Sequence, residues 1–157
     1  MKIRDATPAD ATAACDVLRR SITELCVADH HNDPDILGRW LANKTPEIVA
    51  GWAIDTENSL LVATDVDTIL AVGAVRNSGE ITLNYVAPEA RFRSVSSALL
   101  ATLETRAADR GNTRCRLLST QTAHRFYLSR GYVDDGVPQG KFGTNSSYPM
   151  FRQISPG

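Results

Sequence analysis

Apolar residues in the first third of the chain follow first a strand spacing and then a helical spacing. Residues 2–6 alternate between polar and apolar side chains, which predicts a first strand. From residue 8 to about residue 28 apolar side chains recur every three or four positions, which predicts one or two helices. Pro34 and Pro46 each suit the first position of a further helix. This third of the chain is therefore expected to be helical after one strand.

The middle of the chain has the pattern of strands. Apolar runs at 60–63, 69–75 and 81–86 predict three strands, and Asn77-Ser78-Gly79 predicts a hairpin turn between the second and the third. Pro88 cannot donate a backbone hydrogen bond, so the third strand is expected to stop or splay near this residue.

Helices and strands alternate in the remainder of the chain. A helix, a strand, a helix and two short strands are expected, in order, at 94–110, 115–118, 120–130, 132–133 and 148–154. The order is thus β-αα-βββ-α-β-α-ββ. A strand–helix–strand unit implies parallel neighbours and the hairpin implies antiparallel ones. We predict an α/β (α+β) fold with a mixed sheet and helices on both faces, formed by residues 1–157 as one domain.

Composition narrows the class of protein. The chain has 157 residues, of which 43% are hydrophobic and 22% charged, as in an ordinary globular domain. The longest nearly apolar stretch, 68–75, is too short to cross a bilayer, and the N-terminus lacks a secretory signal. Cys15, Cys26 and Cys115 are scattered without metal-ligand spacing. We expect reduced thiols in a cytoplasmic protein with no membrane partner.

Charge is distributed unevenly although the formal net charge is only -1. Residues 1–80 hold 7 Lys and Arg against 13 Asp and Glu, whereas residues 81–157 hold 10 against 5. The asymmetry suggests one cationic and one anionic ligand, although chance asymmetry between solvated surfaces explains it equally well. The arginines between 91 and 130 lack interleaved aromatic residues, which argues against nucleic acid as a partner.

The segment after Val86 has the features of an anion site. A strand end, a short loop and a helix start bring unpaired backbone N–H groups and a positive dipole end together. Charge and hydroxyl donors are added by Arg91, Arg93, Ser94, Ser96 and Ser97. These groups suit a pyrophosphate; the alternative is a plain capped helix with two solvated arginines.

Two motifs resemble those of the GNAT superfamily of acyl-CoA-dependent N-acyltransferases. In that family a strand with Val near its end is followed by Pro, by Gln/Arg-x-x-Gly-x-Gly/Ala and by a helix with Leu-Leu. The matching residues here are Val86, Pro88, Arg91-Phe92-Arg93-Ser94-Val95-Ser96 and Leu99-Leu100. The second family motif, Ala-x-x-Phe-Tyr-x-x-x-Gly-Phe/Tyr, is matched by AHRFYLSRGY at 123–132. The resemblance implies a mostly antiparallel sheet and acetyl-CoA as the cofactor.

The resemblance also implies which residues hold acetyl-CoA. The expected cofactor-binding residues are Tyr85, Val86, Arg91, Phe92, Arg93, Ser94, Val95, Ser96, Ser97, Thr120 and Tyr127. Backbone groups of Tyr85 and Val86 would pair with the pantetheine amides where their strand splays. Ser94 and Ser96 stand here in place of the family's two glycines. Their hydroxyls can hydrogen-bond a phosphate; alternatively, their bulk can weaken the phosphate-binding loop.

The implied reaction is direct attack of a primary amine on the acetyl group. Tyr127 matches the family tyrosine whose hydroxyl lies near the CoA sulfur; the alternative is an aromatic wedge beside Phe126. An alkyl amine is neutral in only about one molecule in 2,500 at pH 7, so a base is expected. Glu80 is the ionisable base on the preceding strand; alternatively it is a solvated residue beside the turn.

The acceptor, an amine of a small molecule or a protein, is expected between the first helices and the strands. Its candidate ligands are Asn84, Glu24, Asp29 and His30, whose acidic surroundings favour a cation; the alternative is a solvated loop between helices. The adjacent His30 and His31 cannot readily face one ion, so no metal site is expected. Trp40 and Trp52 are interpreted as core anchors.

One functional alternative and one assembly remain open. A non-catalytic acyl-CoA-binding sensor module would share the cofactor-binding residues without an acceptor. The strand at 148–154 makes a homodimer plausible.

Overall fold

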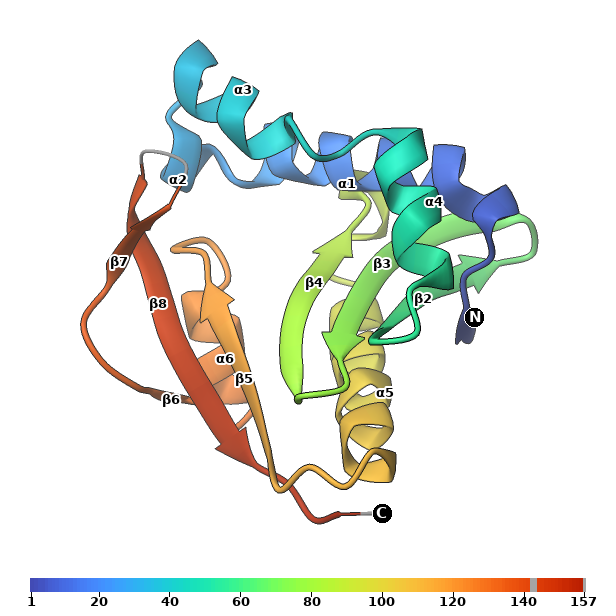
Figure 1. The fold of residues 1–157 in the computed structure, drawn as a ribbon. Coiled ribbons are helices and arrows are strands. Elements are labelled where there is room, and N and C mark those ends of the chain that lie inside the picture. Colours follow the sequence, from blue (N-terminus) through green and yellow to red (C-terminus); the bar gives the residue numbers. More distant parts are fainter. Residues whose placement is uncertain (142–143, 157) are drawn as a thin grey trace.

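One eight-stranded sheet forms the centre of the protein, as the computed structural model shows for residues 1–141 and 144–156 (Figure 1). The strands follow the order β1-β2-β3-β4-β5-β8-β6, and β7 pairs with β8. Their bounds are β1 Lys2–Asp5, β2 Asn58–Asp65, β3 Thr68–Arg76, β4 Glu80–Val86, β5 Arg114–Ser119, β6 Val133–Asp134, β7 Gln139–Lys141 and β8 Thr144–Gln153. Every described pair is antiparallel except β4 with β5. The expected mixed, mostly antiparallel α/β class is confirmed.

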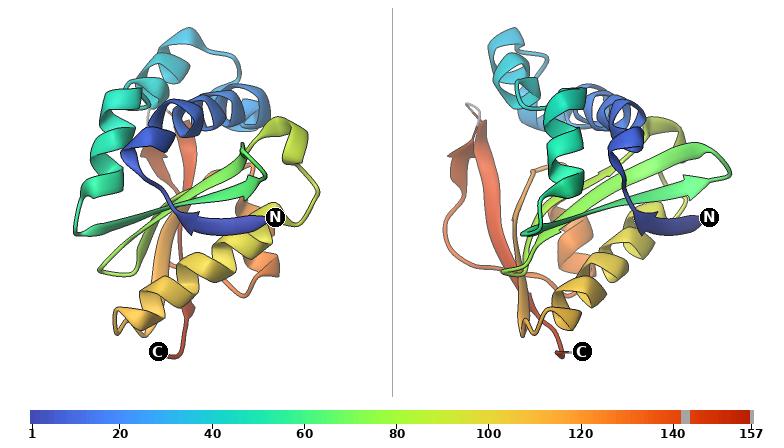
Figure 2. Two further views of the ribbon diagram at one scale, coloured as in Figure 1. Left: turned by 90° about the vertical axis from the view of Figure 1, so that its right-hand side faces the viewer. Right: turned by 45° about the vertical axis from the view of Figure 1, so that its right-hand side comes forward.

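Helices cover both faces of this sheet (Figure 2). They are η1 Pro8–Asp10, α1 Ala11–Leu25, α2 Val27–His30, α3 Pro34–Leu41, α4 Pro46–Ile54, η2 Pro88–Ala90, α5 Val95–Asp109 and α6 His124–Ser129. The helices α1 to α4 lie on one side, and α5 runs along the other (Figure 2). At Gly73 on β3 an added Cβ would lie 2.9 Å from Leu103 Cδ1 and 3.0 Å from Leu99 Cδ2, so α5 approaches the sheet closely where no side chain intervenes.

The structure differs from the expected elements in several places, among them the start of β8, which begins at Thr144 and not near residue 148. The helical pattern of 8–28 is divided into η1, α1 and α2, and Cys26 separates α1 from α2 because it leaves the helical conformation at φ -103 and ψ 29. The helix expected from 120 begins only at His124. The strand β7 was not expected, since its short segment follows Gly136 and a proline and lacks alternating apolar residues.

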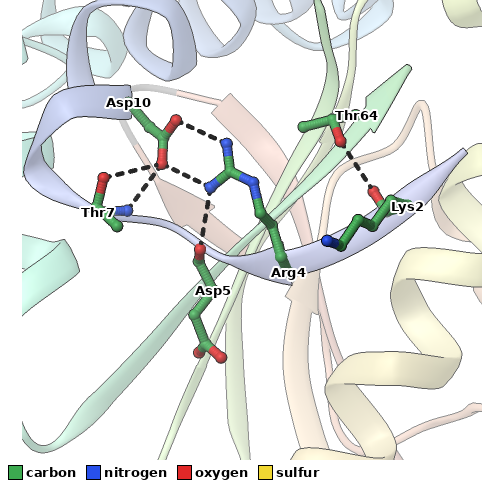
Figure 3. Close-up of polar contacts among 6 residues, drawn as sticks. All are labelled: Lys2, Arg4, Asp5, Thr7, Asp10 and Thr64. Atoms are coloured by element: carbon green, nitrogen blue, oxygen red, sulfur yellow. Dashed lines mark hydrogen bonds and ion pairs between the residues drawn. The ribbon is translucent and has the colours of Figure 1, made fainter. Parts of the chain in front are cut away.

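An ion pair between Arg4 and Asp10 joins the N-terminal strand β1 to η1 (Figure 3). Arg4 donates from Nη1 and Nη2 to the carboxylate of Asp10 at 2.8 and 2.9 Å. The backbone N–H of Thr7 donates to the same carboxylate at 2.8 Å, as in a capping box. Hydrogen bonding from Arg4 lowers the pKa of Asp10 to about 2.

The parallel pair β4–β5 is short, and this feature positions the site. Only Glu80 with Arg116 and Ile81 with Leu117 are in register. Beyond them the two strands diverge, as Figure 1 shows. On its other side β4 stays paired with β3 as far as Val86 opposite Ala71. The expected splay is therefore present, and the β5-facing edge of β4 carries no ladder from Thr82 onward among the described residues.

Candidate active site

A cavity of about 480 Å³ lies at the open end of the split between β4 and β5. Its walls come from the end of α1, the end of β4, the loop before α5, and α6. All the residues expected to hold the cofactor line it except Arg93: Tyr85, Val86, Arg91, Phe92, Ser94, Val95, Ser96, Ser97, Thr120 and Tyr127. Segments from four parts of the chain are thus brought together around one space.

The loop before α5 has an unusual backbone. Phe92 and Ser94 adopt left-handed conformations, with φ of 64 and 61. Ser94 is the N-cap of α5, and the first intrahelical bond runs from Ala98 N to Ser94 O at 3.2 Å. The N–H groups of the three residues between them have no helical acceptor of their own. Several such donors and the nearby Arg91 guanidinium fit a diphosphate.

Tyr127 projects a buried hydroxyl toward the same cavity. Asn84 donates from Nδ2 to this hydroxyl at 3.3 Å, so the phenol hydrogen is left to donate elsewhere. The rings of Phe126 and Tyr132 pack edge-on at centroid distances of 5.2 and 5.5 Å. Burial raises the pKa of Tyr127 to about 12, which keeps the phenol protonated at neutral pH.

Two further cavities continue from the first. A narrow one of about 50 Å³ lies in the β4–β5 split and shares Asn84 and Tyr127 with the large cavity. A third, of about 250 Å³, lies between β4 and the α3–α4 region. Tyr85 lines all three. The split thus lies between a large cavity and a smaller one, and shares lining residues with both.

Comparison with known protein families decides the class of protein. The model of the acetyltransferase (GNAT) domain matches residues 41–150. The chain belongs to the GNAT acetyltransferase family. No curated protein matches the chain significantly in sequence.

Solved structures share the fold of this GNAT domain. The PaiA N-acetyltransferase of Thermoplasma acidophilum, solved with coenzyme A, has a TM-score of 0.85 at 17% identity, with 98% of each chain covered. A GCN5-related N-acetyltransferase of Rhodopseudomonas palustris has a TM-score of 0.85 at 21% identity, with 98% of this chain and 95% of that chain covered. An aminoglycoside 6'-N-acetyltransferase, also complexed with coenzyme A, has a TM-score of 0.73 at 17% identity, with coverages of 100% and 99%. The expected family and fold are confirmed.

Three residues expected to bind the acceptor, Glu24, Asp29 and His30, line none of the three cavities of this GNAT domain. Glu24 is exposed on α1 and lines none of the three cavities. His30 is fully buried; its Nε2 lies 2.9 and 3.1 Å from the carbonyls of Ile22 and Thr23, and its Nδ1 accepts from Asn32 N–H at 2.9 Å. These contacts close the α1–α2 bend and satisfy the ring. Both ring nitrogens are used within the fold, so the contacts of His30 give no support to the expected role in substrate binding.

Asp29 has a structural role in the fold. Its buried carboxylate accepts from the N–H groups of Gln121 and Thr122 at 2.7 and 3.2 Å and from the Thr122 hydroxyl at 2.5 Å. Residues more than ninety positions apart are thereby joined. The contact holds the turn before α6 and explains why that helix begins late. Local sequence spacing contains no signal for such a pair.

Glu80 is placed away from the reacting groups of the GNAT site. It is exposed at the start of β4 and lines none of the three cavities. Asn84 lies four residues further along the strand, a separation of about 13 Å at roughly 3.3 Å per residue. The geometry does not support the expected general base. Asn84, in contrast, lies at the junction of the large cavity and the split.

Other site types are not apparent in the described residues. No group of three or more His, Cys, Asp or Glu side chains among them is arranged to hold a metal ion. None of the helices within residues 1–141 and 144–156 is both long and apolar enough to cross a membrane.

Substitutions of Ser94 test how well a serine fits the left-handed position at which the family has a glycine. Ser94→Gly is expected to change the free energy of unfolding by less than about 1 kcal/mol, because relief of the left-handed strain is offset by backbone entropy. Ser94→Val is expected to lower it by about 1–2 kcal/mol, since a β-branched residue fits φ above zero poorly. Urea denaturation of both variants measures the difference. Equal stability of the two variants would contradict the left-handed conformation.

Proposed function

We propose that this GNAT domain transfers an acetyl group from acetyl-CoA to a primary amine by direct attack. The observation that carries the proposal is the position of the buried Tyr127 hydroxyl, oriented by Asn84 where the large cavity meets the β4–β5 split. Acetyl-CoA supplies the thioester whose sulfur must leave as the amine bond forms. Two of the structural relatives were solved with coenzyme A, which supports this cofactor.

The large cavity offers separate groups for the two ends of the cofactor. N–H groups at the start of α5 and the Arg91 side chain would bind the diphosphate. The edge of β4 at Tyr85 and Val86 would pair with the pantetheine amides, as an added strand does. Thr120 accepts from Ala123 N–H at 3.1 Å, so its hydroxyl hydrogen is left to donate.

Tyr127 would stabilise the leaving sulfur by a hydrogen bond and keep its proton. A free thiol has a pKa of about 8.5, whereas that of Tyr127 is about 12. Full proton transfer to the sulfur would then be uphill by about 5 kcal/mol, at 1.36 kcal/mol for each pKa unit. A hydrogen bond that strengthens as negative charge develops needs no such transfer.

The amine must reach the site already neutral. No carboxylate or imidazole lines any of the three cavities among the described residues. Burial raises the pKa of the Cys26 thiol, which lines the large cavity, to about 12, so this thiol stays protonated. Deprotonation of the amine is therefore assigned to bulk water.

The pH profile tests this assignment. For an amine of pKa near 10, kcat/KM is expected to rise about tenfold per pH unit from pH 6 to 9, because the neutral fraction rises by that factor. The profile should level off only at the pKa of the amine itself. A plateau that begins below pH 8 and is the same for amines of different pKa would reveal an enzyme base.

The function itself is tested by two measurements on one protein sample. Calorimetry with CoA measures cofactor binding, and thiol release from acetyl-CoA with a panel of amines measures transfer. We expect binding, and thiol release that depends on the amine. Binding of CoA without thiol release for any amine would instead identify a non-catalytic acyl-CoA-binding module.

A further inference from the structure

The 250 Å³ cavity beside β4 has a positive lining. Its charged side chains are Lys44 and Arg76, and no described carboxylate lines it. The other lining side chains are amides, a hydroxyl, small aliphatic groups, and the aromatic rings of Trp40, Trp52 and Tyr85. The acidic character of the first half of the chain therefore does not extend to this cavity.

The two cationic side chains differ in burial. Lys44 is only 5% exposed, and its Nζ donates to Asn43 Oδ1 at 2.7 Å. Arg76 is half-buried at the end of β3, and its Nη1 lies 3.0 Å from Asp55 Oδ2, outside the cavity lining. Solvent and salt screen the charge of the buried Lys44 little, so this charge acts strongly on an incoming ion, whereas the partly exposed Arg76 is screened more.

The cavity adjoins the split that holds the reacting groups. Thr82, Leu83 and Tyr85 line both this cavity and the β4–β5 split, and the split also contacts Asn84 and Tyr127. A molecule seated beside Lys44 and Arg76 can thus extend one end through the split toward the Tyr127 hydroxyl. The volume lies just below the roughly 300–1,000 Å³ that holds drug-sized ligands, so the molecule is small.

We propose that this cavity binds the acceptor and that the acceptor is a small amine which also carries a carboxylate on an apolar body. The inference rests on the proposed acetyl transfer. The carboxylate is bound by Lys44 and Arg76, the apolar body lies against Trp52 and Tyr85, and the amine enters the split. The amine nitrogen forms a bond to the acetyl carbon, the carbon–sulfur bond breaks, and the amine proton passes to water.

Matched acids and amides test the carboxylate. Phenylalanine, leucine and glycine are each compared with the corresponding amide in thiol release from acetyl-CoA, with spermidine and benzylamine as amines that lack a carboxylate. We expect kcat/KM to be at least tenfold higher for the acid in each pair that reacts. The amine of the amide loses its proton more easily than the amine of the acid, so a larger fraction of the amide is neutral and reactive. This difference alone would favour the amide, which is the opposite of the expected result.

Two variants assign the preference to the cavity. Arg76→Gln is expected to lower the acid-to-amide ratio at least fivefold without changing the KM for acetyl-CoA, because Arg76 does not line the cofactor cavity. The matched control is Lys2→Gln, which removes one exposed positive charge on β1 that lines no cavity. The control should retain the wild-type ratio. Circular dichroism of both variants confirms that they fold.

Each outcome has a separate meaning. Reaction of the amides or of spermidine as fast as the acids would overturn the inference and leave acetyl transfer standing. An unchanged ratio in Arg76→Gln would also overturn it. If no amine reacts, acetyl transfer fails, and calorimetric titration of the CoA-saturated protein with the same pairs decides the inference: tighter binding of the acids supports it, and equal binding overturns it.

Discussion

Tyr127→Phe is expected to lower kcat by about 10²- to 10³-fold, the usual effect of removing one donor to a developing negative charge. The KM for acetyl-CoA should change less than about twofold, because Tyr127 lines one end of a cavity whose other contacts come from β4 and α5. Steady-state thiol release at saturating amine measures both constants. Because the phenylalanine ring keeps the edge-on packing with Tyr132, the variant should fold.

Tyr148→Phe is the matched control for this variant. Tyr148 stacks on His124 at a centroid distance of 4.0 Å and lines none of the three cavities, so kcat should stay within about twofold of wild type. Equal kcat for Tyr127→Phe and wild type would remove Tyr127 from the mechanism. A large rise in KM for acetyl-CoA with unchanged kcat would assign it to cofactor binding.

Asp29→Ala is expected to lower the free energy of unfolding by about 3 kcal/mol, because two N–H groups and a hydroxyl lose a buried charged acceptor. The turn at Gln121–Thr122 precedes α6, so the variant should also weaken CoA binding. Urea denaturation and calorimetry measure the two effects.

Asp33→Ala provides the comparison for Asp29→Ala. Asp33 is an exposed N-cap of α3 and accepts from the N–H groups of Asp35 and Ile36. Its loss is expected to cost about 1 kcal/mol. CoA binding should be unchanged, because Asp33 does not line the cofactor cavity. A similar loss of stability in the two variants would show that the contact between α2 and the turn contributes little.

Local patterns predicted the features that depend on neighbouring residues. The hydrophobic spacing of β2 to β4, the splay near Pro88 and the helix start at Ser94 all follow from side chains within a few positions. Each of the two motifs is continuous in sequence, so its residues could be recognised without the fold. The resemblance to the family then implied that Tyr127 and the loop residues share one site, and both line the large cavity. Arg93 is the exception: the spacing that includes it does not determine which way its side chain points.

The rest of the site depends on contacts between distant segments. Asp29 was interpreted as a ligand for a cation, but its partners at 121–122 lie beyond the reach of any periodicity. Lys44 and Arg76 come from a helix–helix loop and a strand end, and only the folded sheet brings them to one cavity. Glu80 was predicted to be the base only because it is the ionisable base on the strand before the loop. Its presence on the strand does not show which end of the strand lies near the reacting groups.

The two-residue seam between β4 and β5 divides the sheet into two leaves that are joined by hydrogen bonds at one end only. Such a joint resists opening less than a full ladder, since each missing pair removes backbone hydrogen bonds. Pantetheine lying along the free edge of β4 would act as a brace between the leaves. Rigidity at the point of reaction would then come from the cofactor itself, and departure of the product would return the leaves to their looser state.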